Sequence, residues 1–161
     1  MKQSRRHFLT QTCPSVAFAF FGLSFLVACS SDSNAAGPTN TDQPGGESGF
    51  EVNGNTITVD LSNANFSDIS EPGGYTNILT AGVLLLRIST TEIAAYDNCC
   101  PHDGTRNQWY RTGNNWVCDD HGNSFSSDGV NERSCNSGAT SGGLKKFTTT
   151  LNNNTLVVTK S

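Results

Sequence analysis

The sequence predicts a small all-β fold, an antiparallel sandwich or barrel, for residues 50–161. Three observations lead to this prediction. Short runs alternate apolar and polar residues, turns rich in glycine and asparagine separate the runs, and no segment of useful length shows a helical period. These 112 residues are about the modal size of one domain, and no internal repeat divides them.

The expected strands follow from these runs. Turn residues at Asn53–Asn55 and at Asn152–Asn154 each lie between two short alternating runs, a pattern that predicts two hairpins. Between them, longer apolar runs predict individual strands. In chain order, the segments expected to form strands are "FEVNGNTITVDL" (50–61, a hairpin), "VLLLRIS" (83–89), "EIAAYDN" (92–98), "NWVCDD" near Trp116 and Val117, and "KKFTTTL" with "TLVVTK" (a closing hairpin).

Residues 1–28 have the pattern of an export signal. Arg5 and Arg6 precede an apolar run, Val16–Ala28, that is too short to span a membrane comfortably. The arginine pair resembles a twin-arginine signal, although such pairs also occur in ordinary secretory signals. "LVAC", residues 26–29, resembles a bacterial lipobox, which implies cleavage before Cys29 and a lipid on that cysteine.

The next segment, residues 29–49, predicts a flexible linker between this lipid anchor and the domain. It is dominated by Ser, Gly, Asn, Asp and Pro, so it cannot bury enough apolar surface to offset its ordering entropy. We therefore expect an exported protein that is anchored by lipid to a bacterial membrane and faces the periplasm, or that lies on the outer membrane.

The charge balance limits the partners. All fourteen acidic residues lie beyond Cys29, whereas three of the ten basic residues lie within the signal, so the formal charge after cleavage is 7 − 14 = −7. This acidity argues against nucleic acid, which favours clustered Lys and Arg. An acidic domain suits a protein partner with a basic patch.

Soft metal ligands are concentrated in one segment, "NCCPHDGTRNQWYRTGNNWVCDDHGNSF", residues 98–125. It holds three of the six cysteines and two of the three histidines. Cys100 and His102 form a C-x-H pair, and Cys118 and His121 form a C-x-x-H pair. Two thiolates and two imidazoles suit either a tetrahedral zinc ion or an iron–sulfur centre.

The spacing favours the iron–sulfur centre. Structural zinc sites usually pair Cys with Cys and His with His, whereas here each pair is mixed, and C-x-H is tight for two ligands of one ion. If both cysteines hold one iron and both histidines hold the other, each loop spans a two-iron centre. Zinc, and a disulfide framework with incidental histidines, remain as alternatives.

At these residues the sequence resembles the Rieske [2Fe–2S] family. The family pattern C-x-H, about fifteen to seventeen residues, then C-x-x-H is matched by Cys100, His102, Cys118 and His121, and Gly122 follows the last histidine as it does in the family. The resemblance covers most of residues 50–161. It implies a Rieske-type β fold with two cluster-binding loops, and a [2Fe–2S] cluster held by those four residues.

The chain departs from the cytochrome bc-type members of that family. Thr105 and Asp120 stand where those relatives carry a disulfide between the two loops, and Asn123 and Phe125 stand where they carry hydroxyl donors to the cluster. Fewer donors and several nearby carboxylates favour the oxidised cluster, which implies a reduction potential in the lower half of the Rieske range.

The two remaining cysteines of the domain predict a disulfide. Cys99 adjoins a predicted ligand, and Cys135 lies where bc-type relatives carry the loop that covers the cluster. Exported proteins rarely keep exposed thiols, so a Cys99–Cys135 bridge is expected, with two buried free thiols as the alternative.

Together these features predict a one-electron carrier with a protein donor and a protein acceptor. No catalytic triad, phosphate loop or mononuclear-iron site is visible in the sequence. Two alternatives remain: a small Rieske subunit of a membrane-associated oxidoreductase, of cytochrome bc type or arsenite-oxidase-like, and a metal-binding lipoprotein without redox function.

Overall fold

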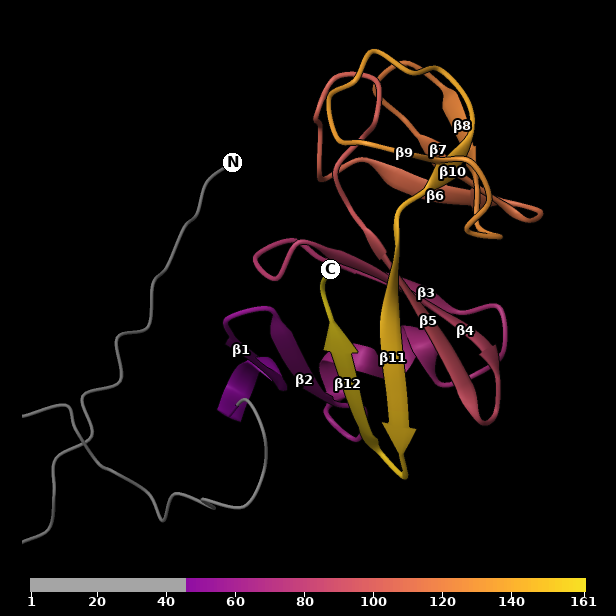
Figure 1. Ribbon diagram of the computed structural model, residues 1–161. Coiled ribbons are helices and arrows are strands. Elements are labelled where there is room, and N and C mark those ends of the chain that lie inside the picture. Colours follow the sequence, from indigo (N-terminus) through magenta and orange to yellow (C-terminus); the bar gives the residue numbers. More distant parts are fainter. Residues whose placement is uncertain (1–45) are drawn as a thin grey trace, which may run out of the picture. The chain divides into compact units, whose positions relative to one another are not determined.

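A computed structural model describes residues 46–161 of the protein (Figure 1). The predicted export signal, the predicted lipidation site Cys29 and residues 29–45 of the predicted linker lie outside the described residues. Within the described part the chain is almost entirely β, as the sequence predicts, and its only helices are two short 3-10 segments, Gly46–Ser48 and Ala64–Ile69. No helix in residues 46–161 has the length and hydrophobicity needed to cross a lipid bilayer.

The larger sheet has seven strands and curls into half a barrel. Every neighbouring pair in it is antiparallel. In spatial order its strands are β1 (Phe50–Asn53), β2 (Thr56–Asp60), β12 (Thr155–Thr159), β11 (Lys146–Asn152), β5 (Glu92–Asp97), β4 (Val83–Ser89) and β3 (Tyr75–Ile78).

The smaller sheet has five strands and is mixed. The hairpins within it are antiparallel, but β10 runs parallel to both of its neighbours. The prediction of an antiparallel fold is therefore wrong for β10. In spatial order the strands are β6 (Trp109–Thr112), β7 (Asn115–Cys118), β8 (Asn123–Ser126), β10 (Gly143–Leu144) and β9 (Glu132–Arg133).

The predicted hairpins and central strands are confirmed. Strands β1 and β2 turn at Gly54, where φ is 58°, and β11 and β12 turn at Asn153, where φ is 52°. Glycine and asparagine tolerate this left-handed conformation better than other residues, which is why the sequence marks both turns.

Strands β4 and β5 are buried on both faces, and this explains their continuous apolar sequences. Leu85 and Ala95 face the core inside the curled sheet. Leu84, Leu86 and Tyr96 face the other way, into a second core shared with the smaller sheet. Because side chains alternate along a strand, one strand pair can join two cores.

The smaller sheet is an insertion between two neighbouring strands of the larger one. The chain leaves β5 at Asp97 and returns to β11 at Lys145, and the Asp97 amide donates to the Lys145 carbonyl at 2.9 Å. Figure 1 shows the smaller sheet beyond the ends of β5 and β11. All four predicted metal ligands belong to this insertion.

Candidate metal centre

Two loops of the smaller sheet carry the predicted ligands. The second loop is the tight turn between β7 and β8, in which Cys118 pairs with Asn123 across the hairpin. The Gly122 amide donates to the Cys118 carbonyl at 2.9 Å, with φ of 70° at Gly122. A non-glycine residue rarely adopts this φ, so Gly122 allows Cys118 and His121 to face the same side of a short turn.

The first loop joins β5 to β6 and closes on itself. The Cys100 amide donates to the Thr105 carbonyl at 2.7 Å, and the Gly104 amide donates to the Cys100 carbonyl at 2.9 Å. Between these bonds the chain presents Cys100 and His102 toward the second loop. Unlike the second loop, this segment has no strand pairing of its own.

The structure brings all four predicted ligands together. Cys100 and Cys118 are free cysteines with no exposed surface. His102 is half-buried, the His121 side chain is 51% exposed, and their rings lie edge to face with centroids 4.8 Å apart. The cysteines therefore form an inner pair and the histidines an outer pair.

One further side chain that could act as a donor, Asp103, lies close to both pairs; the sequence predicts it as a carboxylate near the cluster but not as a ligand. Its carboxylate lies within 4.8 Å of the Cys100 and Cys118 sulfur atoms, and also within 4.8 Å of the His102 and His121 nitrogens. These two groups of side chains could hold a metal. The only sequence signal for Asp103 is its place directly after His102.

Burial sets the protonation of Cys100. Removal from water, together with the neighbouring Cys118, raises the pKa of Cys100 to about 12. In the absence of a cation this residue is therefore a neutral thiol. A bound metal cation would stabilise the thiolate and displace the proton.

The two histidine side chains differ in their polar contacts. His102 Nδ1 is buried and has no hydrogen-bond partner in the described structure. His121 Nδ1 lies 3.1 Å from the Asp103 carboxylate and 3.3 Å from that of Asp120. A buried polar nitrogen without a partner is costly, and coordination to a metal would satisfy it.

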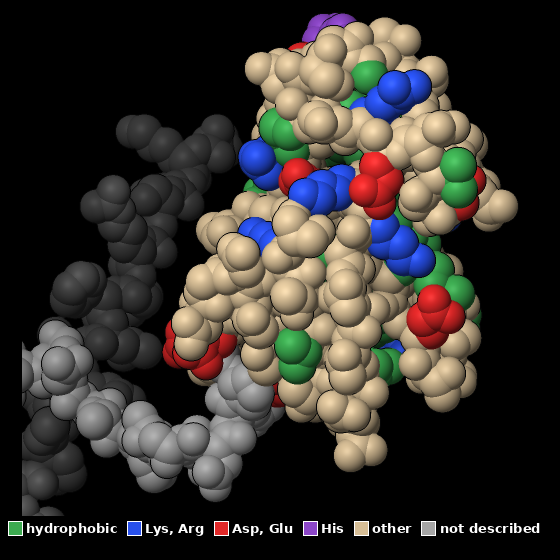
Figure 2. All heavy atoms as spheres, viewed as in Figure 1, with side chains coloured by type: hydrophobic (Ala, Val, Ile, Leu, Met, Phe, Trp, Pro, Cys, Tyr) green, Lys and Arg blue, Asp and Glu red, His purple; other side chains and the backbone are tan. Residues whose placement is uncertain are grey.

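Carboxylates surround the outer pair. The Thr105 amide donates to Asp103 at 3.0 Å and, with the side chain of Asp120, holds the pKa of Asp103 well below its usual range. Thr105 Oγ1 lies 3.3 Å from Asp120 Oδ2, which joins the first loop to the second. In Figure 2 histidine atoms reach the surface at one end of the domain, with acidic atoms beside them.

The two other cysteines within residues 46–161 are placed as the predicted disulfide requires. Cys99 and Cys135 lie at bonding distance, with Cα atoms 5.3 Å apart. That separation is usual for a disulfide. The bridge links the first ligand loop to the segment Cys135–Gly138.

A buried polar network fixes the base of the first loop. Asn98 is fully buried, accepts a hydrogen bond from Arg106 at 2.8 Å and donates to Asn77 at 2.9 Å. Asn77 in turn donates to the Arg106 carbonyl at 2.8 Å. Trp109 Nε1 donates to the Asn98 carbonyl at 2.7 Å. The two ends of the loop are thus tied to each other and to edge strand β3.

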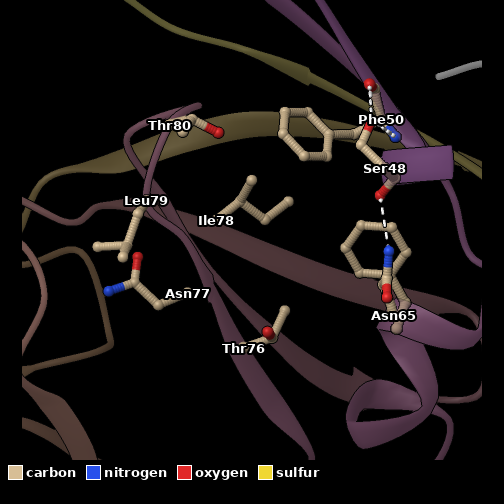
Figure 3. Close-up of a pocket in the computed structure, with 9 residues that line it drawn as sticks. Ser48, Phe50, Asn65, Thr76, Asn77, Ile78, Leu79 and Thr80 are labelled. Atoms are coloured by element: carbon tan, nitrogen blue, oxygen red, sulfur yellow. Dashed lines mark hydrogen bonds between the residues drawn. The ribbon is translucent and has the colours of Figure 1, made fainter. Parts of the chain in front are cut away.

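A groove elsewhere in the fold lacks this chemistry. It has a volume of about 270 Å³ and lies beside β1, β3 and the 3-10 helix Ala64–Ile69 (Figure 3). Its lining is Ser, Thr, Asn and apolar residues, without any Cys, His, Asp or Glu. The Cys and His centre is therefore the stronger candidate site.

Comparison of the chain with family models, curated proteins and solved structures gave no match. The geometry of the residues consequently carries the functional argument.

Proposed function

We propose that the protein is an electron carrier that binds a Rieske-type [2Fe–2S] cluster through Cys100, His102, Cys118 and His121. In this proposal it is exported, is anchored to a bacterial membrane by a lipid on Cys29, and exchanges single electrons with protein partners. The cluster would supply a one-electron redox couple.

The arrangement of the four donors carries the proposal. Each loop contributes one cysteine and one histidine, and the structure sorts them into a buried sulfur pair and an outer nitrogen pair. A single tetrahedral ion gives no reason for this sorting by element. A two-iron centre with sulfur ligands on one iron and nitrogen ligands on the other accounts for it.

The residues around the cysteine pair and around the histidine pair suit the proposed roles of these two halves of the site. Phe125 and Trp116 pack in the same core as the cysteines, so water is kept from the sulfur side. The exposed ring of His121 offers a short route between the site and a docked partner, and the acidic side chains beside it favour a partner with a basic surface.

A second observation supports the Rieske resemblance. Thr105 and Asp120 match the positions at which bc-type relatives link their two loops by a disulfide. In this chain the same two side chains lie at hydrogen-bond distance, 3.3 Å. The loops are therefore adjacent at the place where the resemblance requires a link.

The experiment is metal analysis and spectroscopy of the protein purified without oxygen from cells that supply iron–sulfur clusters. We expect two irons and two acid-labile sulfides per chain, and a rhombic EPR signal after mild reduction. The matched variants are Cys118→Ser, which should lose the signal, and Gln108→Ala, an exposed change in the same insertion, which should keep it.

Stoichiometric zinc without iron or sulfide would refute the proposal in favour of a structural metal site. Two other outcomes separate the remaining alternatives. Copurification with a cytochrome b or a molybdenum subunit would identify a subunit of a membrane-associated oxidoreductase. A bound metal that does not change its redox state would identify a lipoprotein without redox function.

A further inference from the structure

The two ligand loops are held in place by different means. The second loop is part of the β7–β8 hairpin, and pairs such as Val117 with Ser124 and Cys118 with Asn123 fix its ends. Its geometry therefore follows from the sheet itself. The first loop spans the connection from β5 to β6. Its base is fixed by the hydrogen bonds around Asn98, but these bonds do not reach the main chain of Cys100–His102.

The segment Cys135–Gly138 supports that main chain, and we name it the covering segment. Its backbone follows the first ligand loop residue by residue. The amides of Asn136, Ser137 and Gly138 donate to the carbonyls of Cys100, Pro101 and His102 at 3.2, 2.7 and 3.2 Å.

Such bonding between consecutive residues is not a β ladder, in which alternate residues bond to a given neighbour. It depends on left-handed backbone at Asn136, with φ of 55°, and at Gly138, with φ of 76°. Asparagine and glycine adopt this conformation most readily. The Ser137 hydroxyl adds a bond to the Pro101 carbonyl at 3.2 Å.

The disulfide fastens this segment beside the ligands. Cys99 precedes the ligand Cys100 and is only 2% exposed, whereas Cys135 lies at the surface. The bridge spans 36 residues of sequence, so it opposes separation of two distant parts of the insertion. Cys135 is thus the more accessible of the two residues to a reagent in solution.

We propose that the covering segment is a positioning element for one half of the site. It holds the main chain of Cys100–His102, while the half formed by Cys118 and His121 does not depend on it. The role as a metal site rests on the proposed function, but the unequal support of the two loops is a property of this chain. Loss of the bridge should therefore loosen the first loop and leave the second unchanged.

The test compares hydrogen exchange in the two loops, measured by mass spectrometry on peptides that cover residues 99–106 and 117–124. In the double variant C99S/C135S we expect exchange about fivefold faster in the first peptide, because a loop whose carbonyls lose the support of one hydrogen bond from the covering segment opens more often, and unchanged exchange in the second. Equal change in both peptides, or in neither, would overturn the proposal.

A chemical reagent gives an independent route to the same state. A water-soluble phosphine attacks the bridge at Cys135, the exposed residue of the pair, and the sulfur–sulfur bond breaks. Water supplies two hydrogens, which form the two thiols, and its oxygen passes to phosphorus as phosphine oxide. The treated wild type should match C99S/C135S in both peptides. If phosphine leaves the exchange rates of C99S/C135S unchanged, the effect in the wild type comes from the bridge.

A finer pair of variants separates positioning by the covering segment from a change in overall stability. Ser137→Ala removes the hydroxyl bond to Pro101, whereas Ser137→Thr keeps a hydroxyl at that position. We expect faster exchange in the first peptide with alanine and recovery with threonine. Thr140→Ala, an exposed change farther along the same loop, should change neither peptide. Failure of threonine to restore the rate would count against positioning by this hydroxyl.

Two readouts keep this proposal distinct from the proposed function. Exchange in the metal-free protein tests the unequal support without any cluster. In protein that contains iron, C99S/C135S should change the EPR g values at unchanged iron content, because one half of the ligand set has moved. If the exchange asymmetry is present and no iron binds, the proposed function fails and the positioning role stands.

Discussion

The imidazole rings of His102 and His121 lie edge to face, with centroids 4.8 Å apart and ring planes at 73°. One ring comes from the irregular loop after β5 and the other from the turn between β7 and β8. This contact brings two distant parts of the insertion to one surface point, directly outside the buried sulfur pair. In the proposed function it marks the place where a partner exchanges electrons.

The role of Asp103 distinguishes a metal site with four ligands from one with five. It lies within reach of both donor pairs, but the proposed cluster uses only Cys and His. We expect Asp103→Asn to keep its full iron content, and Cys100→Ser to lose most of it, measured by elemental analysis. Comparable loss of iron in both variants would make Asp103 a ligand and would contradict the Rieske assignment.

Phe125 sets an expectation for the reduction potential. This buried side chain packs in the core of the two cysteines and has no hydroxyl to donate toward a sulfur. We expect a potential in the lower half of the Rieske range, which spans roughly −150 to +300 mV. Protein-film voltammetry is the measurement, and a value near the upper end would contradict this expectation.

The variant Phe125→Tyr tests the cause. A new donor worth about 1 kcal/mol to the reduced state would raise the potential of a one-electron couple by about 40 mV. Phe125→Leu, which adds no donor, is the control and should show no comparable rise. The same rise in both variants would assign the effect to packing.

Trp116 links the two sheets. It is fully buried, and its ring lies edge-on to Tyr75 at 5.5 Å and to Tyr96 at 5.8 Å between centroids. Both tyrosines belong to the larger sheet. We expect Trp116→Ala to lower the free energy of unfolding by about 3 to 5 kcal/mol in urea titrations. Tyr110→Ala, an exposed change on β6, should cost about 0.5 kcal/mol or less.

How far the sequence predicts this fold depends on the range of the interactions involved. The β4 run Val83–Ser89 is recognisable because both of its faces are buried, and the turn at Gly54 is recognisable because it needs a special backbone conformation. Strand β8, Asn123–Ser126, was missed because only Phe125 in it is a buried apolar residue. The turn at Gly122, rather than composition, makes it a strand.

The parallel pairing of β10 has no local signal. Gly143 and Leu144 reach their partners only after the chain has passed through the covering segment. The Gly143 amide donates to the Asn131 carbonyl at 3.0 Å, and a side chain at residue 143 would collide with the Val130 carbonyl. The requirement for glycine is thus set by a neighbour thirteen residues earlier in the chain.

The candidate site also has some features that the local sequence predicts and others that depend on contacts between distant residues. Cys100, His102, Cys118 and His121 form two short local motifs, so their spacing alone makes them candidate ligands. The central position of Asp103 and the support from the covering segment depend on the folded loops, and spacing contains no information about either.

Tyr96 gives the domain a specific response to alkaline pH. Burial raises its pKa above the usual value, and its hydroxyl donates to the Ser127 carbonyl at 2.8 Å. A raised pKa means that the folded state holds the proton more tightly than the unfolded state. This contribution to stability is complete below about pH 10, the unfolded value, and is lost as the pH rises through the folded value.

We therefore expect the difference in stability between wild type and Tyr96→Phe to depend on pH. Near pH 7 the variant should be less stable by about 1 kcal/mol, because it lacks the bond to Ser127. Above about pH 10 the wild type should lose stability faster than the variant. Urea titrations from pH 7 to pH 11 measure both, and parallel curves would rule out this role of Tyr96.

The short distance between Asp97 and Lys145 has a consequence for engineering. Since the entry and exit of the insertion are joined by a single hydrogen bond, a tight turn could replace the whole ligand-bearing segment, and β5 and β11 would become an ordinary hairpin. The excised frame would not be soluble as it stands, because Leu84, Leu86 and Tyr96 would face water. Transferring this insertion into another β-sheet protein therefore requires two adjacent strand ends in the host. It also requires an apolar surface on the host sheet, against which the insertion can pack.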